Sequence, residues 1–536
     1  MALYDRGMTK RVLIAGASGM VGERVLHYCL ESERASEVVV LGRRKLPHQH
    51  PKLTQFIHQD FLDLADVEEA FEEIDVCVYC VGAYSGQHSD DEFRKITVGF
   101  TESFGRTLAE KSPQAGLVFL SAQGADLTEK SRMAFARYKG RAENVVLNLQ
   151  FSRLDIFRPG FIYPSRTRVE PSFAYRVFRF LYPALSKLYP NMGLSSDELG
   201  WALAEAALNE PIQMEGPIWE NQEIRTLAQS RSHWVARRAE PFTDKIFLIT
   251  GANTGLGFET ARMCARGGAH TILACRDADK ANLARASLIG EYPDCRVEVV
   301  ELDLASLESV HRCAEALKQQ LDRLDGLVNN AGVMMCPYQT TEEGFEMQMG
   351  VNHLGHFALT GQLLPLLKQA PAARVVSVSS MAHRSAEMDF ENFLYESDEG
   401  YSPLTAYRRS KLANLLFTME LQARLERAGS SVKAVAAHPG VSRTDLARYV
   451  ETSPITGRFF QLVFRFGQSP VMGAQPQMRA LVDREVKGGE YYGPDGFRGM
   501  SGFPVLEKPR PQALVESDRR QLWEISEELT GVRYAL

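Results

Sequence analysis

Residues 246–257 read Ile-Phe-Leu-Ile-Thr-Gly-Ala-Asn-Thr-Gly-Leu-Gly, an apolar run followed by a turn with three glycines. The apolar run at its start predicts a short buried strand. The glycines that follow allow positive φ angles and a close approach of the backbone to a ligand. A helix then begins, and its free amides and dipole suit a pyrophosphate. The stretch therefore predicts the first strand, phosphate-binding turn and first helix of a parallel α/β sheet.

The same pattern occurs a second time at residues 11–22, Arg-Val-Leu-Ile-Ala-Gly-Ala-Ser-Gly-Met-Val-Gly. Strand-like runs alternate with amphipathic helical segments after both copies, which is typical of βαβ units. Four later landmarks recur in the same order in the two halves: Asp60 and Asp303, residues 76–82 and 327–332, Val118–Ser121 and Val375–Ser380, and Arg158-Pro159-Gly160 and His438-Pro439-Gly440. We therefore predict an α/β protein with two tandem Rossmann-type, doubly wound parallel-sheet domains. They are expected at residues 1–230 and 244–536, joined by a polar linker at 231–243.

The composition argues against several classes of protein. A chain of 536 residues is too long for one hydrophobic core, since single cores stop growing at about 250–300 residues. The formal net charge of -6 gives no reason to expect a nucleic-acid partner. No apolar run approaches the roughly 20 residues of a membrane span. Eight cysteines in so long a chain suggest no disulfide framework, so we expect a cytoplasmic protein, and we expect no metal site.

The two glycine turns and the residues that follow the second strands predict dinucleotide binding. An acidic side chain after the second strand binds the ribose of NAD, whereas arginine suits the 2′-phosphate of NADP. Arg43 and Arg44 hold this place in the first half and Arg276 in the second, so both halves favour NADP(H). Asp277, next to Arg276, keeps NAD as the alternative. The predicted residues of the turns are Gly251, Asn253, Thr254, Gly255, Leu256 and Gly257, and Gly16, Ser18, Gly19, Met20, Val21 and Gly22.

The second half also carries a proton-transfer pair. Tyr407 and Lys411 are four residues apart and lie about one turn from each other on one helix face. A free phenol has a pKa of about 10, and a nearby ammonium is expected to lower that value, with further positive charge from a bound oxidised nicotinamide. Ser380, at the end of a strand-like run, can donate a hydrogen bond to a substrate oxygen. Asn352 can anchor a water molecule that joins Lys411 to solvent.

Residues from about 244 onward resemble the short-chain dehydrogenase/reductase family. Three stretches resemble its retinol-dehydrogenase-like branch, which includes protochlorophyllide reductases and the WW-domain oxidoreductase: Ala274-Cys275-Arg276, Asn352-His353-Leu354-Gly355-His356-Phe357 and Ser410-Lys411-Leu412-Ala413-Asn414. The resemblance implies hydride transfer from NADPH, with Tyr407 as the proton donor in reduction and Ser380 polarising the carbonyl. It also implies that Lys411 holds the nicotinamide ribose and that Asn352 completes a proton relay. The further cofactor positions that it implies are Asp303, Asn330, Ala331, Gly332, Pro439, Gly440 and Thr444.

The first half resembles the atypical NAD(P)H-binding members of the same superfamily. Phe135 stands where such members often have tyrosine, although Lys139 is retained, and no asparagine occurs between Val81 and Pro113. A phenylalanine has no proton to donate. We therefore predict that this half binds NADP(H) in a structural or regulatory role without ordinary carbonyl reduction. The alternatives are that the chain senses NADPH and acts through partner proteins, or that the first half performs a hydride transfer that needs no tyrosine, such as enone reduction.

Aromatic residues crowd two segments, 173–189 and 456–466, each interspersed with basic side chains. By resemblance to the superfamily they fall where a substrate lid lies, and apolar lids imply hydrophobic substrates. Peripheral contact with a membrane surface and packing between domains are the alternatives. The sequence thus predicts an NADP(H)-dependent oxidoreductase that interconverts a hydrophobic carbonyl, retinal-like or another lipophilic aldehyde or ketone, and its alcohol. The oligomeric state stays open.

Overall fold

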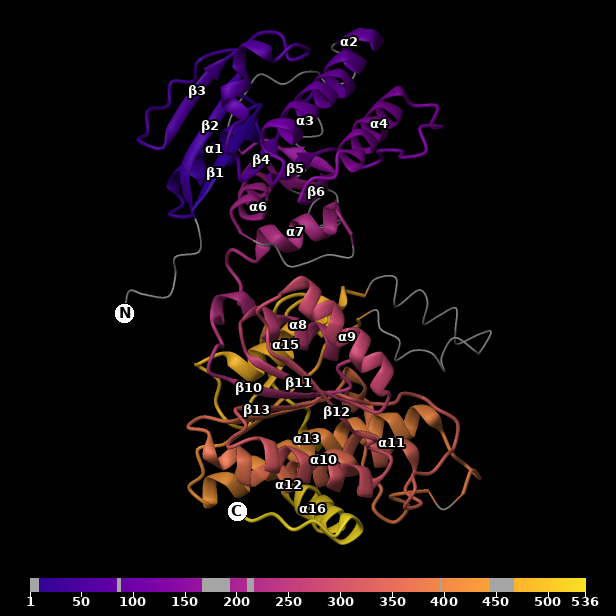
Figure 1. The fold of residues 1–536 in the computed structure, drawn as a ribbon. Coiled ribbons are helices and arrows are strands. Elements are labelled where there is room, and N and C mark those ends of the chain that lie inside the picture. Colours follow the sequence, from indigo (N-terminus) through magenta and orange to yellow (C-terminus); the bar gives the residue numbers. More distant parts are fainter. Residues whose placement is uncertain (1–8, 84–87, 166–192, 210–215, 396, 443–466) are drawn as a thin grey trace. The chain divides into compact units, whose positions relative to one another are not determined.

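The structure is a computed structural model, and it describes residues 9–83, 88–165, 193–209, 216–395, 397–442 and 467–536 (Figure 1). The chain divides into two compact units, Met1–Ser232 and His233–Leu536. Each unit is built on its own sheet. The aromatic segments 173–189 and 456–466, and Thr444, lie outside the described residues.

The first unit holds a seven-stranded sheet in the order β3-β2-β1-β4-β5-β6-β9, with every neighbouring pair parallel. Helices α1 and α6 pack on one face, and α3 and α4 cover the other. The strands are β1 (Lys10–Ala15), β2 (Ala35–Gly42), β3 (Leu53–Ile57), β4 (Val76–Tyr79), β5 (Gly116–Leu120), β6 (Arg153–Arg158) and β9 (Ile218–Glu220). The main helices are α1 (Gly22–Glu31), α2 (Asp90–Arg94), α3 (Phe100–Lys111), α4 (Ala134–Asn148), α6 (Ser196–Leu208) and α7 (Asn221–Gln229).

The second unit holds an eight-stranded sheet in the order β12-β11-β10-β13-β14-β15-β16-β17, parallel except for the β16–β17 pair. Helices α8, α9 and α15 lie on one face, and α10, α12 and α13 on the other (Figure 1). The strands are β10 (Ile246–Thr250), β11 (His270–Cys275), β12 (Val297–Glu301), β13 (Gly326–Asn329), β14 (Arg374–Val378), β15 (Lys433–Ala437), β16 (Tyr491–Pro494) and β17 (Pro504–Glu507). The helices are α8 (Gly255–Arg266), α9 (Ala278–Glu291), α10 (Leu307–Gln320), α11 (Met347–Met349), α12 (Gly355–Gln369), α13 (Pro403–Arg427), α15 (Pro470–Val482) and α16 (Glu516–Thr530).

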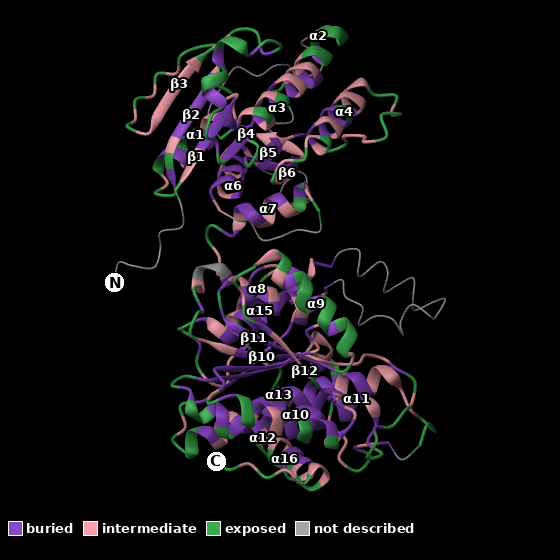
Figure 2. Cartoon of the chain, viewed as in Figure 1, coloured by how far each residue is buried: buried purple, intermediate pink, exposed green. Residues whose placement is uncertain are grey.

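These sheets confirm the predicted Rossmann-type, parallel α/β fold. In each unit the first strand lies between the second strand and the fourth, so the strand order reverses beside the first glycine turn. Ligands of open α/β sheets bind at such a switch point, at the carboxyl ends of the strands. The central strands are buried on both faces (Figure 2), which explains their continuous apolar runs.

The segment predicted as a linker, residues 231–243, is partly packed within the second unit. Val235, Ala236 and Phe242 are buried, and the backbone amide of Ala236 donates to the Gln475 side chain at 2.9 Å. Phe242 packs against Phe247 of β10. The latter part of the segment is therefore anchored by apolar burial.

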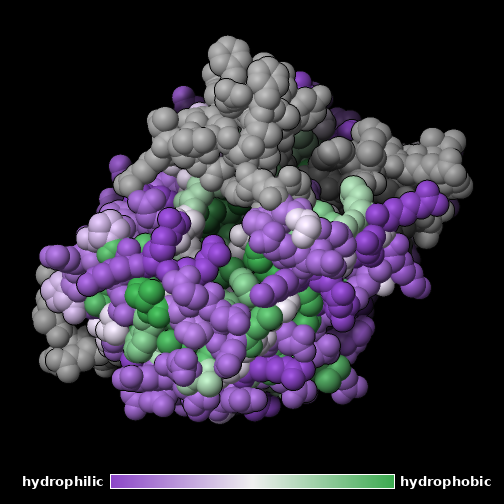
Figure 3. All heavy atoms as spheres, turned by 90° about the horizontal axis from the view of Figure 1, so that it is seen from above, coloured by the Kyte–Doolittle hydropathy of each residue, from purple (hydrophilic) through white to green (hydrophobic). Residues whose placement is uncertain are grey.

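The surface carries few large exposed apolar side chains among the described residues. On the face drawn in Figure 3, hydrophobic residues gather around a hollow, and the ridges beside it are hydrophilic. Within the described residues, none of the helices combines the length and the apolar character that crossing a bilayer requires.

Candidate active site

Helix α13 carries the predicted proton-transfer pair. Ser402 caps its start by accepting from the Thr405 amide, and a proline occupies the first turn, where it costs no hydrogen bond. Tyr407 and Lys411 both lie on its buried side. The Lys411 ammonium donates to the Val378 carbonyl at 3.0 Å and lies 5.9 Å from the centre of the Tyr407 ring. The helix therefore places the Lys411 ammonium beside the Tyr407 ring, one turn along the same face.

Ser380 reaches the same place from the sheet. It follows β14 and begins a short 3-10 helix, Met381–Ser385, where its hydroxyl accepts from the Ala382 amide at 3.2 Å. Its hydroxyl also interacts with the Tyr407 hydroxyl and opposes the rise in the pKa of that phenol. The neighbouring Ser379 hydroxyl donates to the Lys411 carbonyl at 2.7 Å. The carboxyl end of β14 is thus fastened to the catalytic helix.

Asn352 completes the group from a third element. It lies in a π-helix, Gly350–Leu354, between α11 and α12, and such local widening of a helix is frequent at functional sites. Its side-chain amide donates to the Ser410 hydroxyl at 2.9 Å and to the Val333 carbonyl at 3.0 Å. Its side-chain oxygen accepts from the Val333 amide at 2.8 Å. Asn352 therefore links α13 to the loop that follows β13.

Burial shifts the pKa values of Tyr407 and Lys411 in opposite directions. It raises the pKa of Tyr407 to about 12, and it lowers the pKa of Lys411 to about 8. The prediction that the ammonium lowers the phenol pKa is thus wrong for the chain by itself. The physical reason is that desolvation of a buried phenolate outweighs the effect of an ammonium 5.9 Å from the ring centre.

The glycine turn of the second unit, residues 251–257, is shaped to hold a phosphate, and we call it the cradle. Gly251 and Gly255 have φ angles of +65° and +58°. A β-carbon at Gly257 would lie 2.3 Å from the Gly251 carbonyl oxygen, so helix α8 approaches the strand only because this residue has no side chain. Asn253 and Thr254 complete the turn, and Thr254 is the N-cap of α8, whose first turn contains Leu256. The amides at this helix start suit a pyrophosphate.

The residues after β13 join the cradle to the catalytic group. The amides of Asn330 and Ala331 both donate to the Thr250 hydroxyl at 2.9 Å. A β-carbon at Gly332 would lie 3.0 Å from the Asn352 side-chain oxygen and 3.5 Å from the Lys411 nitrogen. The structure therefore brings the predicted phosphate turn and the four predicted catalytic residues together at one edge of the sheet.

The end of β11 presents Arg276 to solvent. Asp277 instead caps α9, since its carboxylate accepts from the Lys280 amide at 3.0 Å, and it pairs with the Lys280 side chain at 3.1 Å. Asp303, beyond β12, accepts from the Ala305 amide at 2.9 Å. The acidic side chain that kept NAD as an alternative is therefore engaged in capping a helix.

The loop after β15 is also tightly built. Gly440 has a φ angle of +65°, and a β-carbon there would lie 2.4 Å from the Met500 carbonyl oxygen. The Pro439 carbonyl accepts from the Gln468 side chain at 2.8 Å. Both residues stand at the carboxyl end of β15, on the same edge of the sheet as the glycine turn.

The first unit repeats the cradle without the acid. Gly16 has a φ angle of +83°, and a β-carbon at Gly22 would lie 2.2 Å from its carbonyl oxygen. Ser18, Gly19, Met20 and Val21 form the rest of this turn, and Arg43 and Arg44 are exposed after β2. Phe135 lies on α4 and stacks on Phe93 with ring centres 6.3 Å apart. Lys139 is buried, which lowers its pKa to about 8.

A further difference in the first unit was missed by sequence reasoning. The Ser121 amide donates to Phe157 after β5 just as the Ser379 amide donates to Ala437 after β14. Ala122 therefore occupies the place of Ser380. The signal was the dipeptide Ser121-Ala122, where the second half has two serines. The first unit thus lacks both hydroxyls that meet in the second.

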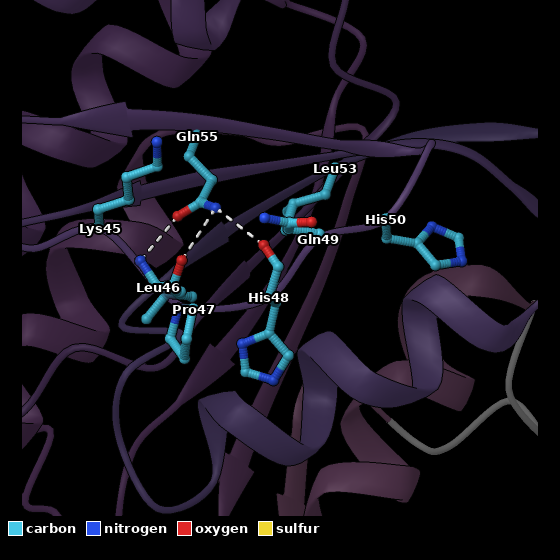
Figure 4. A pocket seen from close by; sticks show the side chains of 8 residues that line it. All are labelled: Lys45, Leu46, Pro47, His48, Gln49, His50, Leu53 and Gln55. Atoms are coloured by element: carbon cyan, nitrogen blue, oxygen red, sulfur yellow. Dashed lines mark hydrogen bonds between the residues drawn. The ribbon is translucent and has the colours of Figure 1, made fainter.

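One hollow of the first unit lies apart from all these residues. It is lined by the loop after Arg44 and by β3, and it includes Lys45, His48, His50 and Gln55 (Figure 4). Gln55 holds the loop, since its side-chain oxygen accepts from the Leu46 amide at 2.9 Å. Among the described residues no group of three or more potential metal ligands occurs.

Comparisons with known proteins agree with this geometry. The model of the short chain dehydrogenases matches residues 245–454, and that of the NAD dependent epimerase/dehydratase family matches residues 12–125. Retinol dehydrogenase 14 of Mus musculus is 43% identical over 301 residues, which cover 54% of this chain and 86% of that protein. Retinol dehydrogenase 13 of Mus musculus is 42% identical over 299 residues, covering 54% and 85%. Retinol dehydrogenase 12 of Homo sapiens is 39% identical over 304 residues, covering 56% and 90%.

The similarity to the retinol dehydrogenases falls in the C-terminal half, where the cradle and the four catalytic candidates lie. The N-terminal half matches a second family of dinucleotide-dependent enzymes and has its own cradle. The chain therefore belongs to the short-chain dehydrogenase/reductase family and is an NAD(P)-dependent oxidoreductase.

Proposed function

We propose that the second unit interconverts a hydrophobic carbonyl compound and its alcohol with NADP(H). The observation that carries the proposal is the meeting of Ser380, Tyr407, Lys411 and Asn352 beside the glycine turn. The relatives are named retinol dehydrogenases, and retinal is a hydrophobic aldehyde. We propose the same class of substrate for this chain, without a choice among retinal and other lipophilic aldehydes or ketones.

Each side chain has a role that its surroundings support. Tyr407 is protonated at neutral pH because burial raises its pKa to about 12, so it has a proton to give to the oxygen of a reduced carbonyl. Ser380 donates a hydrogen bond to that oxygen and polarises it. Lys411 holds the nicotinamide ribose, and Asn352 anchors the water through which the proton is replaced. NADPH, when bound, supplies the hydride.

We propose NADP(H) over NAD(H) because of the residues after β11. Asp277 is held by α9 and Lys280, whereas Arg276 is exposed and has no ion-pair partner among the described residues. An arginine in this place suits a 2′-phosphate. Gly251, Gly255 and Gly257 would hold the pyrophosphate, with Asp303, Asn330 and Pro439 lining the rest of the site.

Turnover by the full chain tests this proposal. Purified protein should oxidise NADPH in the presence of all-trans retinal or a long-chain aldehyde, and more slowly with NADH. Tyr407→Phe removes only the hydroxyl and should lower kcat by ~10²–10⁴-fold, the usual effect of losing a positioned acid. An unchanged rate in this variant would exclude the mechanism, and Tyr401→Phe, on a half-buried tyrosine whose hydroxyl donates to Glu346, serves as the matched control.

For the first unit we propose NADP(H) binding without carbonyl reduction. Phe135 and Ala122 stand where the second unit has its two hydroxyls, while the cradle around Gly16 and Gly22 is intact. Binding without this chemistry fits a structural or regulatory role. A hydride transfer that needs no hydroxyl acid remains the alternative for this unit.

A further inference from the structure

His356 lies at the start of α12, four residues after Asn352, and its ring contacts two separate parts of the site. Its Nδ1 atom is 3.1 Å from the Asn352 carbonyl oxygen, and its Nε2 atom is 2.9 Å from the Thr250 hydroxyl. The side chain is 2% exposed. Neither the turnover mechanism nor the cofactor cradle assigns it a role.

The two contacts fix the tautomer of the ring. A carbonyl oxygen only accepts, so the Nδ1 atom must carry the proton and donate it to Asn352. Burial, with a smaller contribution from the nearby Lys411 ammonium, outweighs the hydrogen bond to Asn352 and lowers the pKa of His356 to about 4, so the ring is neutral. The Nε2 atom of a neutral ring with Nδ1 protonated is an acceptor. The Thr250 hydroxyl must therefore donate to it.

Thr250 carries the connection onward to the cradle. With its proton directed at His356, its oxygen accepts from the Asn330 and Ala331 amides, both at 2.9 Å. The Val328 carbonyl, the other acceptor near this hydroxyl, is farther away at 3.3 Å. Every donor and acceptor of the threonine and of the ring is then used. Such fully satisfied buried networks hold one arrangement of their members.

We propose that His356 is a positioning residue that ties the Asn352 carbonyl to Thr250 and so keeps the proton-transfer group in register with the dinucleotide turn. The proposal rests on the proposed function. Asn352 is held from the other side by Ser410 and Val333, so His356 supplies the restraint that these two contacts lack.

Variants of His356 and of Thr250 distinguish the effect of this connection on turnover from its effect on NADPH binding. His356→Phe keeps a ring of similar shape and removes both contacts, so kcat should fall by on the order of 10–100-fold, as for a displacement of about 1 Å, while the KM of the carbonyl stays nearly unchanged. Thr250→Val removes the hydroxyl that accepts from the Asn330 and Ala331 amides. This variant should therefore also raise the KM of NADPH. Thr250→Ser retains the hydroxyl and should behave like the wild type. Equal losses in Thr250→Ser and Thr250→Val, or a wild-type kcat in His356→Phe, would overturn the proposal.

A spectroscopic measurement tests the same claim without turnover. In the full chain labelled with ¹⁵N-histidine, the ring of His356 should show the neutral form with Nδ1 protonated from pH 8 to pH 5, as should that of His383, whose Nδ1 atom is 2.6 Å from the Ser380 carbonyl oxygen. The His356 signal should be missing in His356→Phe and altered in Thr250→Val. A His356 ring that titrates near pH 6.5, or that carries its proton on Nε2, contradicts the proposal even if the variants fold poorly. If the spectra agree but no carbonyl compound is turned over, the proposed function fails and the structural tie stands.

Discussion

Lys411 shows, at the scale of a single residue, how function conflicts with stability. Its ammonium is buried, and its pKa falls from 10.5 to about 8 because burial penalises the charged form. The unfolded chain therefore binds more protons than the folded chain between these two values. The free energy of unfolding is therefore unaffected by this group above pH 10.5. It falls as the pH drops from there to about 8, and below pH 8 the full cost of the buried charge is present.

Replacing Lys411 by methionine should stabilise the protein at pH 7 and abolish turnover. The pKa drop corresponds to roughly 3 kcal/mol as an upper bound. The Val378 carbonyl keeps a donor, because the Asn414 side chain also donates to it at 3.1 Å. Denaturant unfolding at pH 7 and pH 10 should show a gain for Lys411→Met that shrinks at the higher pH. A loss of stability at pH 7 would contradict this account.

At the scale of an element, helix α8 can begin so close to the strand only because Gly257, in its first turn, has no side chain. The strand, the turn and the helix meet so closely that a β-carbon at Gly257 would lie 2.3 Å from the Gly251 carbonyl oxygen and 2.5 Å from the Asn330 side-chain nitrogen. Both contacts lie inside the cradle. The close approach is thus a condition for the cofactor site rather than for the helix itself.

Gly257→Ala should abolish NADPH binding by the second unit and lower its stability, since overpacking costs about 1–3 kcal/mol. Gly290→Ala is the matched control, because Gly290 lies in α9 with open space where its β-carbon would go. That variant should bind normally and gain about 1 kcal/mol from helix propensity. Fluorescence titration with NADPH and thermal unfolding distinguish the two. Normal binding by Gly257→Ala would refute the assignment of the cradle.

At the scale of the whole molecule, one chain carries two glycine turns of this shape and one complete set of candidate catalytic side chains. The first unit matches a family of dinucleotide-dependent enzymes, yet Phe135 and Ala122 replace the hydroxyls found in the second unit. The two units thus share the glycine turn and differ in the side chains that could move a proton.

Calorimetry with NADPH should find two sites per chain. The double variant Arg43→Ala, Arg44→Ala should weaken one site and leave carbonyl turnover unchanged, because both arginines are exposed and belong to the first unit. Gly22→Ala should remove that site, since its β-carbon would lie 2.2 Å from the Gly16 oxygen. A single site that neither variant affects would mean that the first unit does not bind NADPH.

The sequence by itself determined the fold and the membership of the site. Glycine turns, the four-residue spacing of Tyr407 and Lys411, and the alternation of strands and helices are local features, so they can be read along the chain. The match of Ala122 with Ser380, the rise in the Tyr407 pKa and the bond from His356 to Thr250 came from the folded structure. They depend on burial and on contacts such as that of Thr250 with His356, which are 106 residues apart. Desolvation and long-range hydrogen bonds exist only once the sheet has brought those segments together.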